Sequence, residues 1–249
     1  MKSIVSLLAA LLLPMAAFAQ QGAVRYDATI KLDIQLPPGM EEMAAQIPDS
    51  QTSGRMLYFT EAATLMKDAP KAESDDDGPI EIGGDNFQFR LDNRRPEQET
   101  YISLEDGSMI DKREFMGRKF RVMDQTPEYS WRLTGEQSEY MGYAMMKAVG
   151  QRDTTVVEAW FTPDIPVSAG PDGMGGLPGL ILVASVDEGR RTYTATSVDL
   201  EMSVAGMITP PKGGREVTRE EFDAIVEEKM KEMNAQRSGS GGMRVMIRH

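Results

Sequence analysis

The sequence predicts a mainly β protein, with a curved antiparallel sheet or open barrel and one C-terminal helix packed on it. Three observations lead to this prediction. Apolar and polar residues alternate over residues 24–36, turn residues recur at short intervals, and one amphipathic segment with helix-capping residues lies near the C-terminus. A chain of 249 residues is long enough to form one domain with a packed core.

Residues 1–19 have the pattern of a secretory signal peptide. Lys2 precedes an apolar run, and Ala17 and Ala19 flank Phe18 in the small-x-small pattern of a cleavage site. The run is shorter than the roughly 20 residues that a membrane-spanning helix needs. We therefore expect cleavage after Ala19 and one β-rich domain over residues 20–249. This domain would be exported to the periplasm or secreted, and would not be an integral membrane protein.

The first half of the domain is predicted to consist of strands joined by tight turns. Over residues 24–36 every even position is apolar, which is the two-residue period of a half-buried strand. Pairs such as Asp77-Gly78, Asp106-Gly107 and Met116-Gly117 then separate shorter strand-like runs. These runs lie at residues 55–61, 63–68, 79–83, 86–92, 99–104, 108–115 and 118–123.

The second half continues with strands and ends with a helix. Strands are expected at residues 129–134, 139–148, 153–161, 179–187 and 191–202, with a loop rich in proline and glycine at residues 162–176. A helix is predicted over residues 219–236, because Thr218 and Glu221 form a capping box and Val217 and Phe222 are placed to form a hydrophobic staple. Its apolar face would hold Phe222, Ile225, Val226, Met230 and Met233. After a glycine-serine linker, residues 243–248 alternate again and predict a terminal strand.

Composition excludes several classes of function. Because 39 acidic residues outnumber 27 basic ones, a nucleic-acid partner is not expected. The chain has no cysteine, which excludes thiolate catalysis, cysteine-bound metals and a lipid-modified N-terminal cysteine, so the protein is not expected to be a lipoprotein. Its one histidine is the terminal His249, which leaves little basis for a serine–histidine triad. We predict no catalytic residue, no metal site and no cofactor.

Several sequence blocks of the second half resemble the GLPGLI family of exported Bacteroidetes proteins. These blocks are Trp131-Arg-Leu-Thr, Tyr140-Met-Gly-Tyr, Lys147-Ala148, Ala159-Trp-Phe-Thr-Pro-Asp-Ile-Pro, Gly170-Pro171 and Gly176-Leu-Pro-Gly-Leu-Ile-Leu. The resemblance implies an exported β-rich protein that is often encoded near outer-membrane transport systems, so a transport component is a possible partner. The family has no established activity. Met146 stands where many relatives have cysteine.

The block at residues 176–182 allows two interpretations. Leu177-Pro178-Gly179-Leu180 suits a type II turn with Gly179 at positive φ, and in the first interpretation the two leucines simply anchor this turn in the core. In the second, an apolar lip borders a cavity for a hydrophobic ligand or segment. The candidate ligand-binding residues are Trp160, Phe161, Ile165, Leu177, Pro178, Gly179 and Leu180. Trp131 is interpreted as a core residue.

The function expected from the sequence is a non-enzymatic envelope protein that binds an apolar ligand or partner segment in its curved sheet. One alternative is a copper carrier, because methionine pairs with a spacing of three occur at residues 40/43, 230/233 and 243/246, and thioethers bind Cu(I). Another alternative is a hydrolase that uses carboxylates such as Asp164 and Asp172. The chemistry of no single residue decides among the three.

Export gives a first test. N-terminal sequencing of the protein recovered from the cell envelope is expected to start at Gln20, or at its cyclised form, because Ala17 and Ala19 satisfy the cleavage pattern. A protein that retains Met1 in this fraction would contradict the assignment of residues 1–19.

Overall fold

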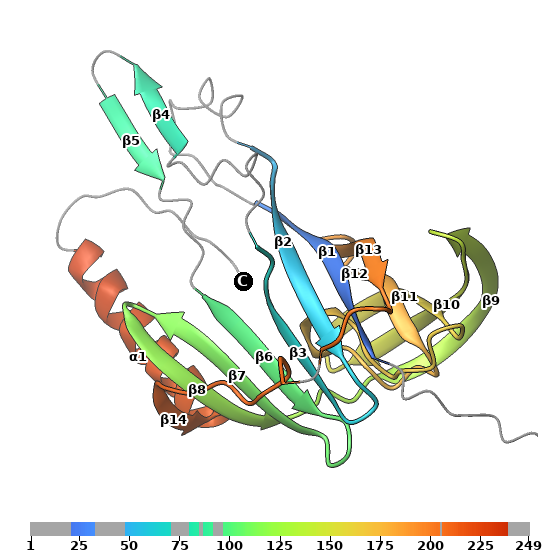
Figure 1. The fold of residues 1–249 in the computed structure, drawn as a ribbon. Helices are drawn as coiled ribbons and strands as arrows, with labels where there is room; N and C mark the ends of the chain where they lie inside the picture. The colour runs from blue at the N-terminus through green and yellow to red at the C-terminus, as the bar shows by residue number, and fades with distance from the viewer. Residues whose placement is uncertain are drawn as a thin grey trace, which may run out of the picture.

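A twelve-stranded curved sheet dominates the fold. The computed structural model describes residues 21–32, 48–70, 80–84, 87–91, 97–204 and 206–238. The strand order is β14-β8-β7-β6-β3-β2-β1-β13-β12-β11-β10-β9, and β4 and β5 form a separate hairpin (Figure 1). The two ends of this order do not pair with each other, so the sheet is open. The predicted mainly β fold with one C-terminal helix is confirmed for the described part of the chain. No helix there is both long and apolar enough to span a membrane.

The strands have the following bounds: β1 Gly22–Lys31, β2 Ser50–Phe59, β3 Ala63–Asp68, β4 Ile80–Gly84, β5 Phe87–Leu91, β6 Gln98–Ser103, β7 Ser108–Phe115, β8 Arg118–Gln125, β9 Ser130–Tyr140, β10 Tyr143–Arg152, β11 Thr155–Thr162, β12 Leu180–Val186, β13 Arg191–Asp199 and β14 Arg215–Thr218. A short 3₁₀ helix occupies Pro171–Gly173, and the α-helix α1 spans Arg219–Ser238. The signal peptide, the end of the first predicted strand and the terminal strand at residues 243–248 lie outside the described residues.

The predicted boundary between two strands of the second half is wrong. Residues 129–134 and 139–148 were expected as strands, but β9 continues to Tyr140 and the turn lies at Met141-Gly142. Both turn residues have positive φ, as a two-residue hairpin turn requires. A glycine such as Gly135 is typical of the end of a strand. Here it lies inside β9 with φ 83°, near a register shift between β9 and β10. The glycine therefore marks a bulge and not the end of the strand.

One strand pair departs from the predicted antiparallel arrangement. β14 was not predicted, and it pairs with β8 in parallel, with Val217 opposite Val122. A four-residue strand is too short to show a clear alternating pattern. The parallel direction is possible because β14 reaches the edge of the sheet through a long connection from β13, whereas a hairpin would impose antiparallel pairing.

Helix α1 begins as the sequence predicts. The Thr218 backbone N–H donates to Glu221 Oε2 at 3.0 Å, and the Glu221 N–H donates to Thr218 Oγ1 at 3.2 Å, which completes the capping box. Val217 and Phe222 lie in one buried cluster with residues of β8. The predicted apolar face holds only near this end, because the side chain of Met230 is 44% exposed. The first turns of α1 therefore provide most of its attachment to the sheet.

The sheet curves strongly at the end that carries β9. Three strands separate β9 from β13, yet Tyr140 Oη of β9 donates to the Ala195 carbonyl of β13 at 2.8 Å. Ala195 lies beside a register shift in the pairing of β1 and β13, where the strand ladder is interrupted. The tyrosine hydroxyl thus bridges across the curve to a carbonyl beside this shift.

The helix cap predicts a measurable loss of stability. Thr218→Ala removes the hydroxyl that accepts the Glu221 N–H, and we expect it to lower the free energy of unfolding by about 0.5–2 kcal/mol. Denaturant titration followed by circular dichroism measures this loss, and Thr218→Ser, which retains a hydroxyl, is the control. Equal stability of the Ala variant and the parent would show that the cap does not contribute.

Candidate functional site

The segment between β11 and β12 lies in the curve of the sheet. Residues 163–179, called the inner loop below, place Ile165, Val167 and Ala169 in the main apolar core, with exposed residues between them. Two main-chain bonds tie this loop to β12, from the Leu180 N–H to the Ile165 carbonyl at 3.0 Å and from the Ile181 N–H to the Ala169 carbonyl at 2.9 Å. Within the loop, the Val167 N–H donates to the Ile165 carbonyl and the Ala169 N–H donates to the Val167 carbonyl, both at 2.8 Å, so residues 165–169 form two consecutive three-residue turns. Apolar burial and backbone hydrogen bonds hold this segment against β12.

Most of the predicted ligand-binding residues lie in this core. Phe161, Ile165, Leu177, Gly179 and Leu180 are buried, whereas Pro178 is exposed. As expected for successive strand residues, Trp160 faces the other side of the sheet from Phe161. Its ring is half-buried there, with the Lys147 amino group 5.9 Å from the ring centroid. Because the buried members of this set are covered by the surrounding chain, a ligand could contact them only if that chain moved, and their binding role stays a prediction.

The predicted type II turn at residues 177–180 is wrong. Gly179 does not have a positive φ, and its N–H donates to the Leu177 carbonyl at 2.9 Å, which closes a three-residue turn. Glycine is required here for another reason. A Cβ atom on Gly179 would overlap the carbonyl oxygen of Thr162 and lie 2.7 Å from its carbonyl carbon. The residue with positive φ in this block is Gly176, at 86°.

Trp131 connects the edge strand β9 to the inner loop. Its indole Nε1 donates to the Gly175 carbonyl at 2.8 Å, and its ring covers Gly150 of β10 so closely that a Cβ atom there would lie 2.6 Å from it. The ring also packs against Tyr129, with centroids 5.3 Å apart. Trp131 is thus a half-buried core residue that also fixes the position of the loop.

Two buried tyrosines hold other parts of the inner region. Tyr26 Oη donates to the Ile181 carbonyl at 2.6 Å, next to a register shift between β11 and β12. Tyr193 Oη donates to Asp172 Oδ2 at 3.1 Å, and Arg191 Nη1 donates to the same oxygen at 3.2 Å. Burial raises the pKa of both tyrosine hydroxyls above the ordinary value, so both remain protonated donors at neutral pH.

The two carboxylates considered for hydrolysis have separate partners. Asp164 Oδ2 accepts the Ala144 N–H at 3.2 Å, whereas Asp172 is bound by Arg191 and Tyr193. No group of three or more metal-binding His, Cys, Asp or Glu side chains occurs within the described ranges. Of the methionine pairs, only 230/233 lies in the described part of the chain. Within the described residues, neither the copper alternative nor the hydrolase alternative gains a supporting contact.

A row of charged and polar side chains on the inner face was missed by sequence reasoning. Asp111 of β7 is only 3% exposed, forms an ion pair with Arg113, and lies 3.7 Å from Arg219 of α1. Arg219 also donates to Asp124 Oδ2 at 2.9 Å. Burial is the largest single influence on the Asp124 carboxyl and opposes its ionisation. The hydrogen bonds from Arg219 and the Gln125 N–H, together with the nearby arginine charges, outweigh burial, and the pKa of this carboxyl lies below its ordinary value.

This polar strip separates two apolar clusters. It consists of Arg55, Gln98, Thr100, Asp111, Arg113, Asp124 and Arg219. Along one line of paired residues, Met66 is followed by Thr100, Asp111 and then Val122, so the two polar residues lie between members of the two clusters. The alternation of β7 indicates that charged residues lie on an otherwise apolar strand face, because Asp111 and Arg113 share one face with Met109 and Phe115. A single strand does not reveal which of its faces is the inner one.

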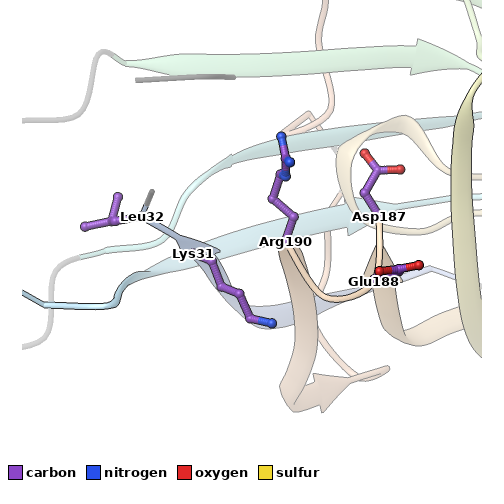
Figure 2. Close-up of a pocket in the computed structure, with 5 residues that line it drawn as sticks. All are labelled: Lys31, Leu32, Asp187, Glu188 and Arg190. Atoms are coloured by element: carbon purple, nitrogen blue, oxygen red, sulfur yellow. The ribbon is translucent and has the colours of Figure 1, made fainter. Parts of the chain in front are cut away.

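A surface pocket of about 360 Å³ lies beside the turn between β12 and β13. It is lined by Lys31, Leu32, Asp187, Glu188 and Arg190 (Figure 2). Acidic and basic groups are equally represented, and the Asp187 carboxylate accepts the Val156 N–H at 3.3 Å. One apolar residue and balanced charges do not favour a particular ligand.

The inner face ends at β9 with an exposed leucine. A line of paired inner residues runs through Tyr193, Ala184, Ala159 and Ala148, all buried, and then reaches Leu133 of β9. Leu133 is 51% exposed. No strand in the described part of the chain pairs with the outer edge of β9, which spans 11 residues. The apolar surface of the sheet therefore continues to an unpaired edge.

Comparisons with known proteins agree with the fold and leave the activity open. The sequence model of a family described as "Protein of unknown function (Porph_ging)" matches residues 118–183. No curated protein matches the chain. Two solved structures of PNGF-II are similar, at 16% sequence identity. The structure in space group P21 covers 83% of this chain with a TM-score of 0.52, and that in space group C2 covers 84% with a TM-score of 0.53. This chain spans about a third of the PNGF-II chain, matching 33% of it.

The close approach at Gly179 predicts strict steric selection. Gly179→Ala places a methyl group against the Thr162 carbonyl, and we expect the free energy of unfolding to fall by about 1–3 kcal/mol. Gly179→Asn is expected to be at least as harmful, although asparagine tolerates a left-handed φ. The exposed neighbour gives the control, since Pro178→Ala should cost less than about 1 kcal/mol. If denaturant titration shows a small loss of stability for Gly179→Asn and a large loss for Gly179→Ala, the interpretation with a positive φ at Gly179 is restored.

Proposed function

We propose that this chain is an exported, non-enzymatic binding protein of the bacterial envelope, of the GLPGLI type, that holds an extended partner segment at the β9 edge of its curved sheet. The observation that supports this most is the position of Leu133. It continues a buried apolar line to an edge where no described strand covers it. A partner strand added there would extend both the backbone ladder and the apolar surface.

A partner segment fits this surface better than a small apolar ligand. The space inside the curve, where a small ligand was expected, contains Ile165, Val167 and Ala169 of the inner loop. Residues 165–169 of that loop are held against β12 through alternating apolar side chains and two main-chain hydrogen bonds. An added strand would make the same two kinds of contact at the free edge.

The two edges of the sheet differ in how well they can accept a strand. β14 has four residues and leads directly into α1, whereas β9 has 11 residues, most of them exposed. Unpaired N–H and C=O groups of a long edge strand are a template for another chain. Trp131 stiffens β9 by binding the inner loop, which lowers the entropy lost when a partner adds. The resemblance to GLPGLI proteins supports a component of an outer-membrane transport system as the partner.

A peptide that alternates valine and threonine provides the test. We expect it to bind the purified protein and to slow hydrogen exchange of the β9 amides, because the added strand pairs with them. Leu133→Lys should weaken binding at least tenfold, since it places a charge beside the incoming apolar side chains.

The control changes an apolar residue of similar exposure away from the edge. Val156 of β11 is 43% exposed, so Val156→Lys alters the charge equally and should leave peptide affinity unchanged. A fluorescent apolar probe tests the small-ligand alternative. Peptide affinity that is indifferent to Leu133→Lys, or protection confined to other strands, would refute edge binding.

A further inference from the structure

The chain itself contains a segment suited to the β9 edge. Residues 243–248 alternate, with Met243, Val245 and Ile247 on one side of the predicted strand and Arg244 and Arg248 on the other. This segment lies outside the described residues, and its strand conformation is the prediction made above from its alternation. It has the apolar face that a strand beside Leu133 requires.

Its charge also complements the acceptor. The segment has two arginines and no acidic residue, whereas the whole chain has a formal charge of −12. On β9, Glu136, Glu139 and Arg132 are all exposed, which gives this strand a formal charge of −1. Opposite charges on adjacent strands stabilise their pairing and favour association of the two surfaces.

The segment cannot reach β9 of its own copy. Helix α1 ends at Ser238, so residues 239–242 are the only linker before the predicted strand. Four extended residues span at most about 14 Å. Helix α1 lies at one end of the molecule and β9 at the other, with the sheet between them (Figure 1). A second copy must therefore supply the acceptor edge.

We propose that residues 243–248 of one copy add as a strand to β9 of a second copy and so link copies head to tail. This inference rests on the proposed function, because it identifies the partner segment of the same edge. The contact joins two different surfaces, the terminal segment of one copy and the β9 edge of another. A copy that donates its segment can therefore still accept the segment of a further copy at its own β9 edge.

Self-association of the purified chain tests this proposal. We expect sedimentation velocity to show a weight-average mass that rises with protein concentration. Leu133→Lys on the acceptor and the double variant Val245→Asp/Ile247→Asp on the donor should each abolish the rise, and Val156→Lys should preserve it. An equimolar mixture of the Leu133→Lys and Val245→Asp/Ile247→Asp chains should form a dimer and no larger species, because one donor and one acceptor remain intact. Circular dichroism confirms that every variant is folded.

A chain that stays monomeric at all concentrations, as it would if the segment paired with β14 of its own copy, overturns the proposal. Association that persists in Leu133→Lys also overturns it. A synthetic peptide of residues 239–249 then separates this inference from the function on which it rests. If the valine–threonine peptide binds β9 and this peptide does not, the self-association model fails while edge binding stands. If neither peptide binds, both fail.

Discussion

Burial of the inner loop in the curve of the sheet is the constraint on which the rest of this structure depends. The loop supplies Ile165, Val167 and Leu177 to the core, so the strands around it must bend far enough to enclose them. Register shifts between β11 and β12 and between β1 and β13 produce such bending. They also interrupt the strand ladder, and tyrosine hydroxyls bind carbonyls beside both shifts.

Local sequence signals predicted the elements whose boundaries are set by nearby residues. The bounds of β3 and β7 agree with the predicted runs, and those of β7 do so because Asp106-Gly107 and Met116-Gly117 flank the strand. The start of α1 follows from Thr218 and Glu221, whose mutual hydrogen bonds form within four residues of sequence. In these cases the determining contacts are local, and a single sequence contains them.

The features that were missed depend on contacts between distant residues. Gly135 reads as a strand break, but pairing with β10 carries the strand through it as a bulge. Gly179 is explained by the carbonyl of Thr162, 17 positions earlier, and not by its own φ. For the candidate site, the sequence identified the apolar residues of the inner loop but not Leu133, because its exposure depends on the position of β9 at the edge of the sheet.

The polar strip has a consequence for how the molecule unfolds. Strand pairing continues through the polar strip without interruption. Apolar packing stops there, because Thr100 and Asp111 lie between the two clusters. Hydrophobic burial gives a domain much of its cooperativity, while ion pairs such as that of Asp111 and Arg113 add little net stability after desolvation. We therefore expect the end that carries α1 and the end that encloses the inner loop to unfold as two separate units. The smaller unit, built on Phe120, Val122, Val217 and Phe222, would open first while the curved end remains folded.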